Sequence, residues 1–333
     1  MAKTALLRAG GYAALRRLAP SRQLAILRYH AICDRGAGYA DPGICVTPAA
    51  FEAHVAYLAA HYRVLPLPEA AAALARGAAL PSNAVAVTFD DGYRDNLEAA
   101  KTLARHGLSA TFYITAGCLA DGAPFWPAEL RALVRAIAAP EIRLDVDGDS
   151  VALPLGNDGD RRCAISSLTR ICKGHRIPVR EAVREQLRRL APAADPASPM
   201  LTWDELREMR DLGMVIGSHT MTHPNLPNAG AADAAREIAG SKTALEEALG
   251  VPVTMFSYPN GGADRYMTPE IARLVREAGF EAATTSRNAF AGPRSDLFAL
   301  ERIQVSERLE DLLFALEVER FAFRPRPRPL EEA

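Results

Sequence analysis

The stretch AVAVTFDDGYRDN, residues 84–96, joins a short apolar segment to two adjacent carboxylates. Residues 84–89 are apolar and rich in β-branched side chains, and this composition and length predict a buried strand. Asp90 and Asp91 follow at once, and a glycine comes next. Like charges repel each other. In a surface loop the pair would mean little, but at the end of a buried strand it indicates a candidate active site.

Strand-like segments of the same kind recur along the chain, and helical patterns separate them. The predicted strands are residues 23–30, 84–89, 109–115, 214–218, 253–258, 280–286 and 299–305, and the predicted helices are residues 48–61, 93–106, 203–212, 231–249, 269–278 and 307–320. This alternation is typical of a parallel sheet. Seven units predict an α/β fold, a distorted seven-stranded parallel (β/α) barrel, with a doubly wound open sheet as the alternative. No G-x-G-x-x-G follows a predicted strand, so nothing indicates a dinucleotide site.

An insertion at residues 117–200 interrupts the alternation after the third strand. Two alternating runs in EIRLDVDGDSVALPL (141–155) predict a hairpin, and two charged helical stretches follow it. We expect a lid or side lobe on the barrel rather than an independent domain. The predicted organisation is a basic arm (1–22), a single barrel domain (23–320) that contains the insertion, and a disordered Arg/Pro tail (321–333).

The composition narrows the function and the compartment. The 333 residues carry a formal net charge of −1, so no overall basic field indicates nucleic-acid binding. Five cysteines without a C-x-x-C pair fit a reducing compartment. No apolar run has membrane-spanning length and the start is a poor signal peptide, so we expect a cytoplasmic protein. The basic arm suggests weak peripheral contact with the inner face of the membrane, although two central glycines favour a solvated or docked arm.

Polar groups follow four of the predicted strands at the same end. They are His30 after the first strand, Asp90 and Asp91 after the second, SHTMTH (218–223) after the fourth and YPNGG (258–262) after the fifth. Because functional groups of a parallel barrel gather at the carboxyl ends of its strands, we expect these groups to share one rim.

His219 and His223 have a spacing that suits metal binding. On one helical turn, imidazoles four residues apart face the same way and can hold one ion. The residues between them are Thr-Met-Thr, so the H-E-x-x-H metalloprotease motif is excluded. A third ligand must come from elsewhere, and an aspartate on a neighbouring strand would supply it.

The paired aspartates can then divide the work. One binds a divalent ion, and the other accepts a proton from the water that the ion makes acidic. The ion also offsets the repulsion between the two carboxylates. An Asp-His-His set suits zinc first, with cobalt, nickel or iron as alternatives. Without the histidines, a turn with an N-cap aspartate would be the better interpretation.

Three motifs carry a family resemblance. TFDDG (88–92), SHTMTH (218–223) and FSYPNG (256–261) resemble the first three motifs of the polysaccharide deacetylases of the NodB-homology type. The resemblance covers residues 23–305. It implies the seven-unit barrel, a carbohydrate N-deacetylase activity, and an N-acetylated sugar or glycan as the substrate.

The resemblance also implies residue roles. Asp90 is the general base, and the metal ligands are Asp91, His219 and His223. The turn formed by Tyr258, Pro259 and Asn260 lies on the substrate side, and the backbone N–H of Asn260 helps to stabilise the tetrahedral oxyanion.

Two departures from the family pattern concern the third and fourth motifs. The third motif usually begins with an arginine that orients the base, and Ser257 stands there in this chain. Arg302 or Arg265 could take over that function. The fourth motif, an Asp–Trp combination, has no clear match, and TTSRNAF (284–290) occupies its region.

The third departure concerns the general acid. The family's last strand carries a histidine that protonates the leaving amine, and residues 299–305 contain none. His30, at the end of the first strand, is the expected substitute, because in a closed barrel a strand from either end of the sequence can fill the same slot. Members resembling the poly-N-acetylglucosamine deacetylases look circularly permuted in this way. The alternative is a histidine that merely caps a strand.

The leading hypothesis is a metal-dependent N-deacetylase, acting on a substrate such as a lipid- or nucleotide-linked glycan precursor. One alternative is an amide hydrolase that resembles the allantoinases, because a shared fold does not decide the substrate. Another is a carbohydrate-binding relative with weakened catalysis, to which the missing arginine and fourth motif lend weight.

Overall fold

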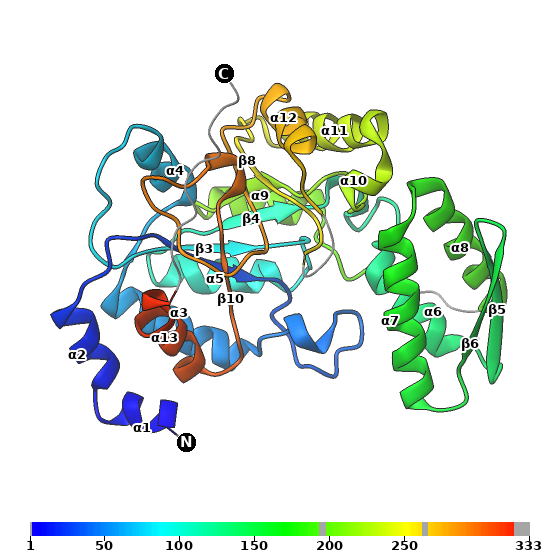
Figure 1. Cartoon of the computed structure of the whole chain (residues 1–333), viewed down its shortest axis with the longest axis horizontal. Coiled ribbons are helices and arrows are strands. Elements are labelled where there is room, and N and C mark those ends of the chain that lie inside the picture. Colours follow the sequence, from blue (N-terminus) through cyan, green and yellow to red (C-terminus); the bar gives the residue numbers. More distant parts are fainter. Residues whose placement is uncertain (1, 193–197, 262–265, 323–333) are drawn as a thin grey trace.

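The computed structural model describes residues 2–192, 198–261 and 266–322. Its centre is a parallel sheet in the order β10-β1-β3-β4-β7-β8-β9 (Figure 1). The strands are β1 (Ala25–Tyr29), β3 (Ala84–Phe89), β4 (Thr111–Ile114), β7 (Val215–Ser218), β8 (Met255–Ser257), β9 (Ala282–Thr284) and β10 (Ile303–Gln304), and the short β2 (Arg63–Val64) pairs with β3. A single parallel bridge, Thr284 to Leu300, links β9 to the segment before β10. The predicted α/β fold with a distorted seven-stranded barrel is confirmed.

Helices pack around the sheet, most of them on its outer surface. They are α3 (Pro48–His61), α4 (Leu67–Ala75), α5 (Asn96–Arg105), α9 (Trp203–Asp211), α11 (Ala231–Leu249), α12 (Pro269–Glu277) and α13 (Leu309–Glu317). The buried residues of α4 belong to the cluster that contains Tyr113. Threonine caps begin three of them: Thr47, Thr202 and Thr268 each accept a hydrogen bond from a backbone N–H of the first turn. The helix α4 was not expected from the sequence, but the other six were.

Side chains alternate between the helices and the barrel interior. Ala84 and Ala86 on β3 face an inner cluster that contains Tyr113, while the intervening Val85 packs against the helices. Small residues make room for that tyrosine: a Cβ at Gly217 would lie 2.6 Å from Tyr113 Cδ1. The interior therefore becomes polar only near the carboxyl ends of the strands.

The insertion forms a side lobe next to the barrel (Figure 1, right). It consists of α6 (Trp126–Ala136), β5 (Glu141–Val146), β6 (Asp149–Pro154), α7 (Asp158–Gly174) and α8 (Ile177–Leu190). The predicted hairpin turns at Asp147 and Gly148, both of which have positive φ as a tight hairpin requires. The helices and the hairpin share a hydrophobic cluster of their own, separate from that of the barrel. The helix α6 was not expected.

The N-terminal arm is docked on the barrel. It comprises α1 (Ala2–Arg8) and α2 (Gly11–Leu18), both of which contact α13. Lys3 Nζ lies 2.8 Å from Asp311 Oδ1, and the buried Arg16 guanidinium reaches Glu317. Internal ion pairs thus use two of the basic side chains that suggested membrane contact.

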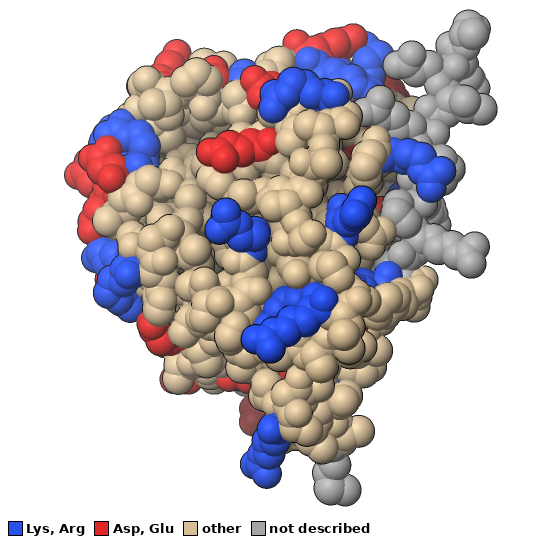
Figure 2. Space-filling view, turned by 90° about the vertical axis from the view of Figure 1, so that its left-hand side faces the viewer, with Lys and Arg blue, Asp and Glu red and all other residues tan. Residues whose placement is uncertain are grey.

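The face in Figure 2 gives that contact no further support. The Lys and Arg side chains of the described residues are spread over this face, several of them beside Asp or Glu, and form no continuous basic patch. Within the described ranges, no helix combines the length and apolar character needed to span a membrane. Residues 323–333 of the predicted tail lie outside the described residues.

Candidate active site

A cavity of about 320 Å³ opens at the carboxyl ends of the strands. It collects six of the predicted site residues: His30, Asp90, Asp91, His219, His223 and Asn260. Neither Tyr258 nor Pro259 lines the described wall. The Tyr258 ring packs in the main core, and its hydroxyl donates to the carbonyl of Phe298 at 2.9 Å. Arg265 lies outside the described residues.

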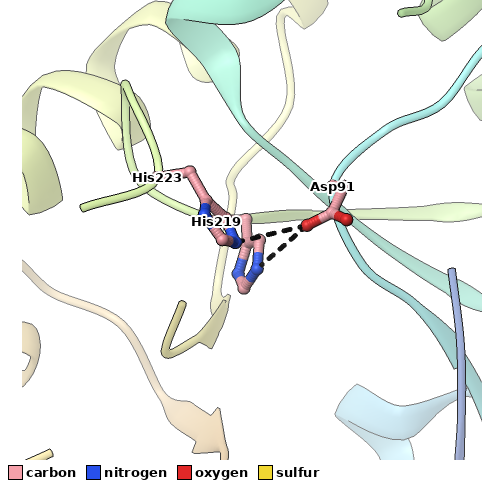
Figure 3. A group of neighbouring side chains, drawn as sticks. All are labelled: Asp91, His219 and His223. Carbon is pink, nitrogen blue, oxygen red and sulfur yellow. Dashed lines mark ion pairs between the residues drawn. The ribbon is translucent and has the colours of Figure 1, made fainter. Parts of the chain in front are cut away.

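Three of these side chains form a candidate metal centre (Figure 3). Asp91 Oδ1 lies 3.5 Å from His219 Nε2 and 3.4 Å from His223 Nε2. Ligand atoms on one tetrahedral zinc, with bonds of about 2.0–2.1 Å, stand roughly 3.3 Å apart. The donor set and its spacing therefore fit a divalent ion. Three protein ligands leave a coordination position open, which is typical of a catalytic rather than a structural site.

The histidines do not share a helical turn, which corrects that part of the sequence interpretation. Residues 219–225 are irregular, and both Thr220 and His223 have positive φ, 67° and 56°. Such values are uncommon for a β-branched residue such as Thr220. His223 N–H donates to Thr220 Oγ1 at 3.0 Å, which helps to close the loop. An irregular loop with two residues of positive φ, rather than a helical turn, therefore carries the two imidazoles.

Hydrogen bonds orient the ligand loop from several sides. His219 Nδ1 lies 2.8 Å from the carbonyl oxygen of Ser257, so this nitrogen carries the proton and Nε2 is left to bind metal. The Glu237 carboxylate, on α11, accepts from the backbone N–H groups of Met221 and Thr222 at 2.9 and 2.7 Å. No local motif in the sequence indicated Glu237, because it acts across the fold.

The side lobe also holds this loop. Trp126 Nε1–H donates to the carbonyl of His223 at 3.0 Å. Arg180, on α8 and almost fully buried, donates to the carbonyl and the hydroxyl of Thr222 at 3.0 and 2.9 Å. The insertion therefore helps to position a candidate metal ligand, in addition to walling the cavity.

Asp90 is held by a buried arginine. The two terminal nitrogens of Arg302, Nη1 and Nη2, lie 2.6 and 2.7 Å from the two carboxylate oxygens. The same guanidinium donates to Ser257 Oγ at 3.0 Å, so the small serine leaves space for an arginine that comes from the position just before β10. Burial acts to raise the pKa of Asp90, but the charge of Arg302 outweighs it and holds that pKa well below its usual range. Asp90 is therefore an ionised acceptor.

His30 stands on the other side of Asp90. Its Nε2 lies 3.7 Å from Asp90 Oδ2, and its buried Nδ1 has no partner among the described residues. Burial lowers the pKa of His30 to about 4, although Asp90 and Asp91 act to raise it. At neutral pH the resting imidazole is therefore uncharged.

Asn260 lines the cavity together with the candidate metal ligands. It has a φ of 73°, and its side-chain amide donates to the carbonyl of Pro224 at 3.1 Å. This bond ties the turn after β8 to the loop that carries His223. Within the described residues its backbone N–H donates no hydrogen bond that would occupy it.

Acidification is expected to destabilise the metal-free protein between about pH 6.5 and 4. Burial lowers the pKa of His30, His54 and His219 to about 4 and that of His223 to about 3, against 6.5 in an unfolded chain. Because the folded pKa values are the lower ones, their stabilising effect is complete above pH 6.5 and is lost as pH falls through that window. Each group contributes up to about 1.4 kcal/mol per pH unit. Urea unfolding at a series of pH values measures this slope.

His54 provides the test of this assignment, because it lies away from the cavity. Its side chain is fully buried, with Nδ1 3.2 Å from the hydroxyl of Tyr29. The variant His54→Gln should reduce the slope of the unfolding free energy against pH by the contribution of one proton. An unchanged slope would show that His54 does not titrate in this window.

The distorted parallel barrel and the Asp–His–His cluster at its rim define a barrel protein with a candidate metal centre. Within that class, the chain belongs to the polysaccharide deacetylase family, whose model matches residues 77–140 and 162–283, more than half of the chain. The Bacillus subtilis protein YxkH, whose name assigns it provisionally to the polysaccharide deacetylases, is 23% identical over 299 residues, 89% of this chain and 76% of YxkH.

Two solved structures show the same fold. The deacetylase PplD of Streptococcus pyogenes, solved in complex with acetate, has a TM-score of 0.60 at 19% identity and covers 90% of this chain and 99% of its own. IcaB from Ammonifex degensii has a TM-score of 0.58 at 19% identity, with 90% of this chain and 98% of IcaB covered.

Proposed function

We propose that the protein is a metal-dependent hydrolase that removes N-acetyl groups from an N-acetylated sugar or glycan. The observation that carries this proposal is the Asp91–His219–His223 cluster beside an ionised Asp90 in one cavity. The family supports a carbohydrate substrate, and the acetate in the PplD complex agrees with the release of an acetyl group. The missing arginine of the third motif had suggested a relative with weakened catalysis. Arg302 removes that argument, because its guanidinium contacts the proposed base Asp90.

The proposed mechanism assigns a task to each residue around the acetamido group. Asp91, His219 and His223 would hold a divalent ion, which would polarise a carbonyl oxygen and make a water molecule more acidic. Asp90 accepts the proton of the attacking water. The N–H of Asn260 donates to the carbonyl oxygen as negative charge develops there. Breaking the C–N bond then requires a proton at the nitrogen.

His30 is the proposed donor of that proton. His30 Nε2 lies 3.7 Å from Asp90 Oδ2, so a proton taken by Asp90 has a short path to the imidazole. From there it protonates the departing amine, and the products are acetate and a free amino sugar.

We also infer a circularly permuted strand order. The first strand, β1, pairs with β3 on one side and with β10 on the other. This arrangement supports the view that His30 occupies the slot of the histidine on the family's last strand. The cytoplasmic location stays a prediction.

Acetate release from short N-acetylglucosamine oligomers tests the function. Protein stripped of metal and reloaded with zinc or cobalt should release acetate, and Asp90→Asn should lower the rate by about 10²–10⁴-fold while metal is retained. His30→Ala should slow the reaction through loss of the acid. Ring-opening of a cyclic ureide, assayed in parallel, identifies a non-sugar amide hydrolase. Ureide opening without acetate release, or metal-independent acetate release, would overturn the proposal.

A further inference from the structure

The two histidines of the candidate metal centre differ in how their rings are held. Within the described residues, Nδ1 of His223 is buried and has no hydrogen-bond partner, whereas Nδ1 of His219 meets the carbonyl of Ser257. A histidine that binds metal usually has such a partner, which fixes the orientation of its ring. The ring of His223 must therefore be oriented by packing and by the backbone that carries it.

The packing against His223 comes from the start of the side lobe. The ring of Phe125 meets the imidazole edge to face, with 5.5 Å between the centroids, and the ring of Trp126 lies 6.1 Å away. The indole N–H of Trp126 also holds the carbonyl of His223, and Arg180 holds the neighbouring Thr222. The start of α6 and the helix α8 thus support this ligand, whose ring lacks a hydrogen bond of its own.

Arg184, on α8, connects α8 to the start of α6. Its side chain is 4% exposed, and its planar guanidinium can serve several acceptors at once. Nε lies 2.6 Å from Glu129 Oε2, Nη1 lies 2.6 Å from Glu181 Oε2, and Nη2 lies 2.8 Å from the carbonyl oxygen of Pro124. Because residues 124 and 129 stand on either side of Trp126, this one side chain fixes the segment that contacts His223.

Glu181 carries a second branch of the same network. Its other carboxylate oxygen, Oε1, accepts from Arg180 Nε at 2.9 Å, and Arg180 in turn donates to the carbonyl and the hydroxyl of Thr222. Two paths therefore lead from Arg184 to the ligand loop, one through the start of α6 and one through Arg180.

We propose that Arg184 is a positioning residue for the metal centre: it holds the start of α6 and Arg180 in place, and these in turn orient His223. Among the described residues, Arg184 neither lines the cavity nor contacts a candidate metal ligand, so it must act through its neighbours. This inference rests on the proposed metal-dependent function and adds the side lobe to the metal centre. If Arg184 only holds the lobe together, its loss will lower stability and leave metal binding unchanged.

Zinc affinity, measured by competition with a chelator of known affinity, tests the proposal. Arg184→Met should lower the affinity about tenfold, within the range that is typical when a group supporting a ligand is lost. The variant should still fold, because Glu129 keeps Arg188 as a partner, with Nε 2.7 Å from Oε1, and Glu181 is partly exposed.

Arg161→Met is the matched control from the same lobe. Arg161 donates to carbonyl oxygens at the opposite end of α6 from Trp126, including that of Ile137 at 2.9 Å. Both variants should lose stability in urea, but Arg161→Met should change zinc affinity by less than about twofold. The visible absorption of bound cobalt, which depends on the coordination geometry, should change in Arg184→Met and not in Arg161→Met.

A double-mutant cycle shows whether Arg184 acts through Trp126. Trp126→Phe removes the indole N–H but keeps a ring beside His223, so it should lower zinc affinity severalfold. If Arg184 holds Trp126 in place, the loss in the double variant is smaller than the product of the two separate losses. A fully multiplicative loss overturns the inference, as does an Arg184→Met variant with the zinc affinity and cobalt spectrum of the wild type.

Glu181→Gln keeps the proposal testable should Arg184→Met fail to fold. It weakens the branch through Arg180 alone, at a partly exposed position, and should lower zinc affinity by less than Arg184→Met would. Zinc affinity equal to that of the wild type in both Glu181→Gln and Trp126→Phe overturns the inference.

Metal binding separates this inference from the failure of the proposed function, because neither the zinc competition nor the cobalt spectrum requires turnover. A protein that binds zinc, loses affinity in Arg184→Met and releases no acetate supports the positioning role and counts against the deacetylase alone. Acetate release by the wild type, with unchanged zinc affinity in Arg184→Met, counts against the inference alone. A wild-type protein that binds no zinc overturns both.

Discussion

Arg302→Met is expected to lower the free energy of unfolding by about 3–5 kcal/mol, because the buried Asp90 carboxylate would lose its partner. The Arg302 side chain is 1% exposed and that of Asp90 5% exposed, so water replaces the lost bonds poorly. Acetate release should also fall sharply, because the base is no longer held in place or kept ionised. Chemical denaturation, followed by the acetate assay, measures both effects.

A double variant shows whether the loss comes from an uncompensated charge. Asp90→Asn combined with Arg302→Met removes both charges and should recover much of the stability, though none of the activity. Arg273→Met is the matched control, since it breaks an exposed ion pair with Glu277 and should cost less than about 1 kcal/mol. Equal losses for Arg302→Met and Arg273→Met would contradict the structural importance assigned to Arg302.

His219→Ala is expected to abolish stoichiometric metal binding, because a two-ligand site remains. The affinity should fall by more than the 10–100-fold that is typical when a group supporting a ligand is lost. Glu237→Gln supplies that milder comparison, since Glu237 holds the backbone of the ligand loop without facing the metal. Equilibrium dialysis against zinc, with the bound metal determined by elemental analysis, measures the series independently of activity.

The surface histidine His106 provides the control for the metal experiment. Its Nε2 lies 2.8 Å from Glu52 on the outside of the barrel, so His106→Ala should leave zinc binding unchanged. Zinc retained at full stoichiometry in His219→Ala would show that the ion binds elsewhere and would remove the basis of the proposed function.

Local sequence patterns predicted most of the elements around the site. The strand at 84–89 ends where expected, because an apolar run with β-branched residues stops at two charges. For the helices that begin at a threonine cap, the predicted boundaries also agree with the observed ones to within one or two residues. The helices α4 and α6 were missed. Each has a proline at its second position, which also suits a loop, and only packing decides between the two.

For His219 and His223, the prediction that both side chains lie at one site was correct, although the helical backbone assumed between them was wrong. The i, i+4 spacing indicated a shared ligand role, and the two imidazoles do meet at Asp91. The backbone between them is not helical, because Glu237 and Arg180 hold Thr222 from opposite parts of the chain. A sequence spacing shows only that two residues are close along the chain, and many backbone conformations can bring their side chains together.

The sequence by itself determined the alternating strands and helices, the DD pair at a strand end and the identity of the candidate metal ligands. The strands, the helices and the DD pair depend on residues within one segment, where local periodicity and side-chain chemistry decide, whereas the metal ligands were assigned by the resemblance of two separate motifs to those of a known family. Only the tertiary structure showed that Arg302, one of the two arginines considered from the sequence, binds Asp90, that β1 lies between β3 and β10, and that Arg28 faces the cavity. These contacts join residues more than 50 positions apart. Their geometry follows from how the barrel is arranged, which no local pattern encodes.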